Sequence, residues 1–405
     1  MLDRTPQTHS TSGFSSTRTA CLLCPQPYLD SLPGVCSMIE MLAEKGVTVD
    51  VFSTCLPQYP APRFDHPRVR LFLHNWEKPD ASRRRRLPVF LYLARQARRQ
   101  APRGGYGTCI GLDPSGFIAA VLASCRTKAR IAYLSLELYP QNEKLSLRQQ
   151  LVKHAERLLS HRVDVLIAQC TRRGAFLARE LSFPKQKLAV WPNAPRGRAQ
   201  RCRSTLLRDR LGIPHSRLLV LHAGMIGKGA QSLDVARAAS AWSLDATLVF
   251  QTRSAAQNNP EAREVLAVAE KPSGRVALND TPWPRRLLEE VVSSADVGLA
   301  WYAPEGKNIE LIGLSSGKLA QYLKCGLPVI VNEPLAWLVS RYNFGICVHS
   351  PREIERALQT VLANRAEFSR NALRCFDEQF ALDRYFPTLW HMLFPDGRNG
   401  PRQPQ

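Results

Sequence analysis

The chain has 405 residues, of which 44% are hydrophobic and 22% are charged, so it can bury large cores and is not an intrinsically disordered protein. Its length favours two domains of about 150–200 residues each over a single core. The formal net charge is +21, and residues 51–210 hold 31 Lys and Arg against 10 Asp and Glu, whereas the remainder holds 24 of each. The excess charge predicts an anionic partner for the first domain, such as a membrane surface or a large ligand.

The start of the chain is rich in Ser and Thr and lacks periodicity, so residues 1–18 are expected to form a disordered tail. No apolar run reaches 18 residues, and we expect neither a signal peptide nor a membrane span. The 11 cysteines are scattered. Cys21 and Cys24 have the spacing of a metal or redox pair, but no second pair accompanies them, which favours buried free thiols over a zinc or redox site. Free thiols indicate a reducing, cytoplasmic location.

The first domain begins with an alternation of strands and helices. Residues 19–24 form a predicted strand, residues 35–45 a helix that Gly46 ends, and residues 47–53 and 69–74 two further strands. This order predicts a Rossmann-like start. Gly34 alone is weak support for a dinucleotide site, because the chain lacks the G-x-G-x-x-G motif there.

A strongly basic segment follows, opened by Arg83, Arg84, Arg85 and Arg86 and continuing to residue 103. Its apolar residues have helical spacing, and a basic amphipathic helix suits an anionic membrane surface, where each basic residue contributes about 1 kcal/mol. An ordinary packed helix with a solvated basic face is an equally good interpretation. Nucleic acid is a weaker candidate, and we do not expect it as a partner, because no recognition motif accompanies the charge.

Two predicted strands, residues 106–112 and 130–136, end at acidic residues. Asp113 and Glu137 therefore lie at carboxyl ends of strands, which face the cleft in an open α/β sheet. Either carboxyl group can bind or deprotonate an acceptor hydroxyl. Alternatively, Asp113 caps the helix that follows it and Glu137 pairs with a nearby Arg. We slightly prefer Glu137 as the functional residue.

The remaining elements repeat the βα alternation and predict a second domain. Strands at residues 163–169 and 188–191 complete the first domain, which we place at 19–195. The basic, aperiodic stretch 196–215 is the predicted linker. A second Rossmann-like domain spans 216–380, a last helix spans 381–395, and 396–405 is a polar, disordered tail. The fold class is therefore α/β, with two Rossmann-like domains facing a cleft, and we expect the last helix to pack back toward the first domain.

The densest motif of the chain spans residues 293–333 in the second domain. A strand at 297–301 is followed by a polar loop, a helix over 318–324 and a strand at 329–331. Ser315 and Ser316 precede the helix, so backbone N–H groups and the positive end of the helix lie beneath the loop. This arrangement predicts a phosphate site that includes Lys318.

Taken together, these features resemble the retaining glycosyltransferases of the GT-B fold, the family 4-like or group 1 enzymes, over roughly residues 19–395. Residues 316–330 (SGKLAQYLKCGLPVI) are similar to a family segment that ends in x-P-V-I, and residues 294–299 (SADVGL) to its preceding strand. Trp191, Pro192 and Asn193 resemble the turn that ends the first domain in this family. Residues 224–229 (GMIGKG) stand where the family has a Gly-rich loop touching the donor diphosphate.

The resemblance implies a role for several residues. Gly224, Lys228, Ser315, Ser316 and Lys318 would bind the donor diphosphate. The family often carries two Glu residues eight positions apart, and Gly313 and Gln321 stand in their places. Gln321 can still bind a ribose hydroxyl through its amide oxygen.

Gly313 has no carboxylate, so Glu310 or Glu305 would have to replace the residue near the sugar. Met225 stands where the family often has Arg. Because of these departures, a protein with reduced or lost activity is an alternative to an active enzyme.

The implied activity is transfer of a sugar from a nucleotide sugar to a hydroxyl of a glycan, glycolipid or other acceptor, with retention of configuration. No cofactor and no metal is expected, because no Asp-x-Asp motif is present and Lys side chains can neutralise the leaving diphosphate. The acceptor is lipid-linked and near a membrane in one hypothesis, with the protein peripheral on the inner face, and soluble in a second. In a third, the chain is a non-catalytic nucleotide-sugar-binding or partner subunit with a degenerate site.

Overall fold

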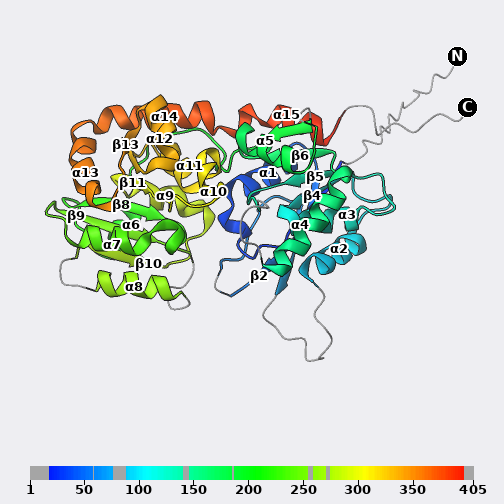
Figure 1. The fold of residues 1–405 in the computed structure, drawn as a ribbon, viewed down its shortest axis with the longest axis horizontal. Coiled ribbons are helices and arrows are strands. Elements are labelled where there is room, and N and C mark those ends of the chain that lie inside the picture. The colour runs from blue at the N-terminus through cyan, green and yellow to red at the C-terminus, as the bar shows by residue number, and fades with distance from the viewer. Residues whose placement is uncertain are drawn as a thin grey trace, which may run out of the picture.

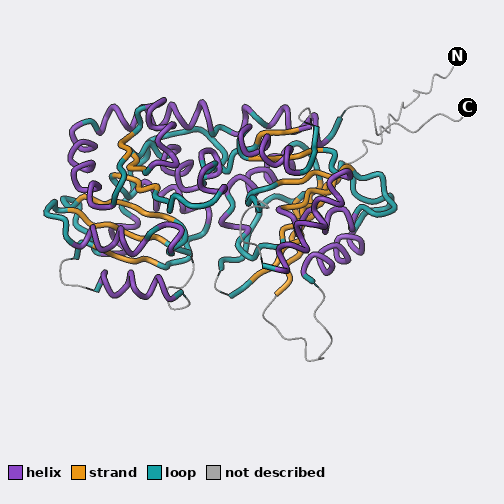
Figure 2. Tube along the Cα trace, in the orientation of Figure 1, coloured by secondary structure: helices purple, strands orange, loops and turns teal. Residues whose placement is uncertain are grey.

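The molecule contains two parallel β-sheets, each covered by helices on both faces (Figure 2). The computed structural model describes residues 18–57, 59–75, 88–139, 146–184, 187–253, 259–270 and 274–395. The first sheet has the strand order β3-β2-β1-β4-β5-β6-β7 and the second the order β10-β9-β8-β11-β12-β13. The prediction of two Rossmann-like domains is confirmed.

The first domain alternates strands and helices along the chain. Its strands are β1 (Thr19–Cys24), β2 (Thr48–Cys55), β3 (Val69–Asn75), β4 (Thr108–Leu112), β5 (Arg130–Leu134), β6 (Val165–Ala168) and β7 (Leu188–Val190). Its helices are α1 (Pro33–Glu44), α2 (Val89–Gln100), α3 (Asp113–Ala123), α4 (Leu147–Leu159) and α5 (Thr171–Glu180). Most strands are apolar throughout because helices bury both faces of the sheet.

The second domain repeats this pattern. Its strands are β8 (Leu218–Ala223), β9 (Ala246–Gln251), β10 (Val276–Asn279), β11 (Val297–Ala300), β12 (Val329–Val331) and β13 (Gly345–Cys347). Its helices are α6 (Leu206–Leu211), α7 (Ser232–Ser240), α8 (Pro260–Ala269), α9 (Leu288–Ser293), α10 (Lys307–Glu310), α11 (Gly317–Lys324), α12 (Ala336–Tyr342), α13 (Ile354–Ala363), α14 (Arg365–Gln379) and α15 (Phe386–Leu393).

Four elements differ from the expectation. The helix expected after the arginine run begins only at Val89, and Arg83–Arg86 lie outside the described residues. The segment interpreted as an aperiodic linker contains α6, which the buried Leu207 and Arg208 anchor to the second domain. The short elements α12 and β13 were not anticipated, because seven and three residues are too few for a reliable periodicity.

The last helix returns to the first domain, as expected for this fold class (Figure 1). The Thr108 hydroxyl at the start of β4 donates to the carbonyl oxygen of Leu393 at 3.1 Å. The ring of Phe386 in α15 lies 6.3 Å from that of Trp191. Within the described residues, no helix is both long enough and apolar enough to cross a bilayer.

Two groups of contacts hold the two domains against each other. The Asn193 carboxamide oxygen accepts from the Gly34 N–H at 3.1 Å, and its amide donates to the Ser315 carbonyl oxygen at 3.1 Å. Elsewhere, Arg253 pairs with Asp30, and Arg285 lies 2.5 Å from the Glu40 carboxylate. Hydrogen bonds and ion pairs therefore both join the two domains.

Candidate functional site

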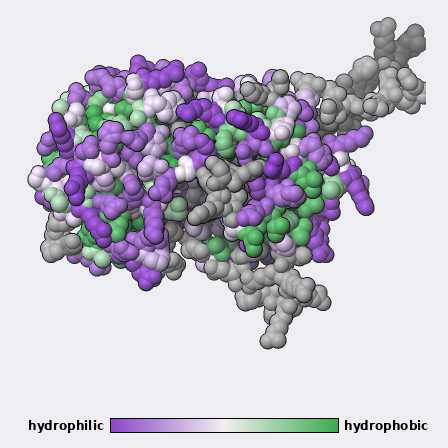
Figure 3. Space-filling model, in the orientation of Figure 1, coloured by the Kyte–Doolittle hydropathy of each residue, from purple (hydrophilic) through white to green (hydrophobic). Residues whose placement is uncertain are grey.

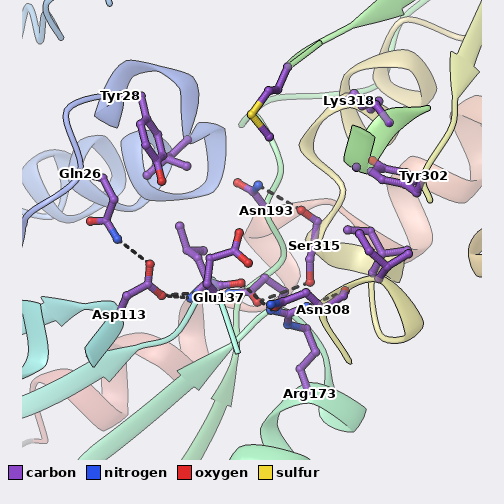
Figure 4. A pocket seen from close by; sticks show the side chains of 18 of the residues that line it. Gln26, Tyr28, Asp113, Glu137, Arg173, Asn193, Tyr302, Asn308, Ser315 and Lys318 are labelled. Atoms are coloured by element: carbon purple, nitrogen blue, oxygen red, sulfur yellow. Dashed lines mark hydrogen bonds between the residues drawn. The ribbon is translucent and has the colours of Figure 1, made fainter. Parts of the chain in front are cut away.

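A cavity of about 360 Å³ lies between the two domains, where the carboxyl ends of both sheets meet (Figure 4). Its walls come from the segments after β1, β4, β5, β6 and β7 in the first domain and after β8 and β11 in the second. Open α/β sheets bind ligands at such strand ends. The lining residues are Gln26, Tyr28, Leu32, Asp113, Leu136, Glu137, Gln169, Arg173, Asn193, Met225, Gly227, Gly229, Ala230, Tyr302, Asn308, Ile309, Ile312, Ser315 and Lys318.

Asp113 connects three loops of the first domain, those after β1, β4 and β5, by hydrogen bonds. One carboxylate oxygen accepts from the N–H groups of Leu136 and Glu137, at 2.7 and 2.9 Å. The other accepts from the Gln26 side-chain amide at 2.6 Å. Burial raises the pKa of Asp113 to about 7, against the opposing effect of these N–H donors. The helix-cap interpretation is wrong in detail, because Asp113 is the first residue of α3 and Leu112 occupies the cap without a side-chain bond.

Glu137 points its carboxyl group into the pocket (Figure 4). The residue itself is exposed, but it lines a concave wall where hydration is restricted, and this raises its pKa. The positive charge of Arg173 acts in the opposite direction. A carboxyl group of this kind can accept a proton from a bound hydroxyl.

Lys318 lies across the pocket from the two carboxyl groups, beside Tyr302 (Figure 4). Its ammonium nitrogen is 4.8 Å from the Tyr302 ring centroid and 3.5 Å from Nε2 of His222, a fully buried residue of β8. Burial lowers the pKa of Lys318 to about 7. Burial and the Lys318 charge together hold the pKa of His222 well below its usual value, so His222 is neutral. An anion that enters the pocket would favour the charged form of Lys318.

The first turn of α11 lies next to Lys318. Ser316 caps this helix, because its hydroxyl oxygen accepts from the Leu319 N–H at 3.2 Å. The same hydroxyl contacts the Tyr302 hydroxyl. The positive end of α11 and the Lys318 side chain therefore face the same cavity, and this combination suits an anionic group.

Asn308 closes the pocket from the second domain. Its carboxamide accepts from the Leu138 N–H and donates to the Leu138 carbonyl oxygen, both at 2.8 Å. The Arg173 guanidinium donates to the Asn308 carboxamide oxygen at 2.9 Å and to its backbone carbonyl oxygen at 3.2 Å. Asn308 thereby holds the loop that carries Glu137 against the second domain.

Replacing Asn308 by Ala is expected to weaken this closure. Leu138 is buried and would lose both partners, and each unsatisfied buried group costs about 1–3 kcal/mol. We expect the melting temperature to fall by at least about 4 °C, because these lost contacts join the two domains. Asn371→Ala, an exposed amide of α14 bonded to the Asn343 carbonyl oxygen, is the matched control. An Asn308→Ala variant with an unchanged melting temperature would show that this contact has no role in holding the domains together.

The structure brings together some of the residues predicted from the sequence. Glu137, Ser315 and Lys318 line the pocket, and Ser316 lies behind it as the helix cap. Gly224 has φ of +121°, and a side chain there would lie 3.5 Å from Lys318 Cε, so Gly224 packs against the Lys318 stem.

Other predicted residues do not line the cavity. These are Lys228, which is exposed, Gln321, and Glu310, which pairs with Lys307 on α10. At Gly313 a side chain would lie 3.2 Å from the Trp337 ring, so a carboxylate would not fit there without movement.

Sequence reasoning missed several lining residues, namely Gln26, Tyr28, Arg173, Tyr302 and Asn308. Tyr302 directly follows the predicted strand of the central motif, and its position at the strand end was the available signal. Arg173 and Asn308 belong to different domains, and nothing in their local sequence indicates that they meet.

Each domain matches a glycosyltransferase domain model. Residues 33–194 match a glycosyl transferase 4-like domain, and residues 270–383 match a glucosyltransferase 3-like C-terminal domain. No curated protein sequence gives a significant match.

Similar solved structures share the architecture at low identity. Sucrose-phosphate synthase from Thermosynechococcus elongatus superposes with a TM-score of 0.67 at 17% identity, covering 94% of this chain and 100% of its own. WaaG, a glycosyltransferase involved in lipopolysaccharide biosynthesis, gives 0.65 at 14%, covering 94% and 100%. Anabaena HepE in complex with UDP and glucose gives 0.64 at 14%, covering 93% and 99%. The chain therefore has the GT-B fold.

Proposed function

We propose that this protein is a glycosyltransferase that moves a sugar from a nucleotide-sugar donor to a hydroxyl group of a glycan or lipid-linked acceptor. The observation that carries the proposal is the interdomain pocket, which sets Lys318 and the start of α11 opposite Glu137. The matches of both domains to glycosyltransferase models support it. A HepE structure in complex with UDP-glucose, at 13% identity and a TM-score of 0.63, supports a nucleotide-sugar donor.

The second-domain wall suits the donor diphosphate. When the bond between the sugar and the diphosphate breaks, negative charge develops on the leaving oxygen, and preorganised donors stabilise it. Lys318 and the positive end of α11 would supply this stabilisation from the chain itself. The pocket-lining Gly227 and Gly229, which have no side chain, would allow the diphosphate close to the backbone.

The first-domain wall suits the acceptor. The acceptor oxygen would form the new bond to the sugar, and its proton would pass to Glu137 or to a diphosphate oxygen. We propose retention of configuration, in which the acceptor attacks from the side of the leaving group. Asp113 would act as a positioning residue, because both of its carboxylate oxygens already accept hydrogen bonds from the surrounding loops.

A second candidate function is a non-catalytic nucleotide-sugar-binding or partner subunit. The exposed Met225 on the pocket wall and the buried Gly313 favour it, because neither supplies the charge that the resemblance leads one to expect. Incubation with a panel of labelled nucleotide sugars separates the two. We expect one donor to release its nucleoside diphosphate and to label an acceptor, whereas binding of a donor without turnover would favour the second candidate.

We further propose a cytoplasmic location. All 11 cysteines are free thiols, including the buried Cys21 and Cys24, in agreement with the prediction from the sequence. Free thiols in this number are typical of a reducing compartment.

A further inference from the structure

Helix α4 leaves three large leucines in contact with solvent. Leu147, Leu151 and Leu158 are 79%, 72% and 67% exposed. Their spacing of four and seven residues places them on one side of the helix. Figure 3 shows hydrophobic residues gathered on the first domain over this helix. Exposed apolar clusters of this kind mark interaction surfaces more often than chance.

Basic side chains flank this leucine stripe. Arg148 and Arg157 of α4 and Arg162 of the following turn (Ser160–Arg162) are exposed. The single carboxylate of this segment, Glu156, is buried, where it pairs with Lys153 at 2.9 Å and accepts from the Tyr133 hydroxyl at 2.5 Å. The outer side of α4 therefore presents leucines between arginines, with no exposed acid.

We propose that the outer side of α4 binds the surface of an anionic lipid bilayer. The leucines would enter the boundary between headgroups and acyl chains, while the arginines would contact lipid phosphates through extended side chains. Charge complementarity favours this occupant over a second copy of the chain, because two such helices would bring their arginines together. This proposal does not depend on the chemistry of the pocket.

Helix α4 lies close to the pocket in the sequence, so a bilayer bound at α4 bears on how the proposed acceptor reaches the pocket. Only residues 138–146 separate Glu137 on the pocket wall from the start of α4. A bilayer bound at α4 would bring a lipid-linked acceptor to the first-domain side of the pocket. That consequence rests on the proposed transfer, whereas lipid binding itself does not.

Vesicle flotation with the full-length protein tests the proposal. We expect binding to phosphatidylcholine vesicles that contain roughly one third phosphatidylglycerol, and at least about tenfold weaker binding to pure phosphatidylcholine. The variant Leu147→Gln/Leu151→Gln/Leu158→Gln should lose binding about tenfold or more at an unchanged melting temperature. The matched control is Leu73→Gln/Leu362→Gln, two leucines that are each 37% exposed on β3 and α13, and it should bind like the wild type.

Several results would overturn the proposal. Equal binding of the wild type to neutral and anionic vesicles, or full binding by the triple variant, would remove α4 as the lipid contact. Loss of binding on changing Arg83–Arg86 to Ser, with the triple variant unaffected, would assign the contact to that segment instead. A wild-type dimer that the triple variant dissociates, without vesicle binding, would show that α4 pairs two copies.

Discussion

Replacing Glu137 by Gln will slow sugar transfer about 10²- to 10³-fold while leaving donor affinity nearly unchanged. The amide keeps the size of the side chain but cannot accept the acceptor proton. The Asp113 bond to the backbone N–H of residue 137 does not involve the side chain, so the loop should keep its position. Initial rates with labelled donor, together with calorimetric titration of the nucleoside diphosphate, separate the two effects.

Glu310→Gln is the matched control for this experiment. Glu310 is exposed on α10, pairs with Lys307 and does not line the cavity. We expect its replacement to change the rate less than about threefold, since exposed ion pairs contribute little. The opposite pattern, with Glu310→Gln inactive and Glu137→Gln active, would contradict the acceptor side proposed for the pocket.

Affinity for a nucleoside diphosphate will fall about tenfold for each pH unit above 7, because the free protein must take up a proton to bind it. The pKa of Lys318 in the empty pocket is about 7, so this side chain loses its charge as the pH rises. A bound diphosphate favours the ammonium form and raises the pKa. Calorimetry between about pH 7.5 and 9, in buffers of different ionisation enthalpy, measures both the slope and the proton uptake.

Lys318→Arg should remove this slope, because a guanidinium stays charged throughout the range. The control Lys307→Arg, on the neighbouring α10, should leave it unchanged. A slope that persists in Lys318→Arg would assign the proton to another group. A flat profile in the wild type would show that Lys318 does not bind the diphosphate.

Much of the fold could be predicted from the sequence, because parallel sheets buried on both faces leave continuous apolar runs. The apolar runs at β1 and β12 are followed at once by Pro25 and Asn332, which locates each strand and its loop. Short elements could not be predicted, because they are too short and too polar to show an apolar pattern. The six residues of α6 include three charged ones, and tertiary contacts of Arg208 rather than periodicity hold that helix in place.

The candidate site was predictable only where its residues are close in the chain. Ser315, Ser316 and Lys318 share one turn, and the helix start that joins them is visible in the sequence. Asp113 and Glu137 could be predicted only from their positions at strand ends, and Gln26, which donates to Asp113, could not be predicted at all. Asn308 and Arg173 meet across 135 positions, so their contact depends on how the domains pack.

The most direct test of a donor site at Lys318 is a thermal-shift measurement with a panel of nucleoside diphosphates and nucleotide sugars. We predict that one nucleotide raises the melting temperature of the wild type, since ligand at about 100 times its Kd adds about 2.7 kcal/mol of stability. The same nucleotide should have no effect on Lys318→Ala. A well-folded wild type that no nucleotide stabilises, or a shift of equal size in Lys318→Ala, would contradict the assignment of the pocket as a nucleotide-sugar site.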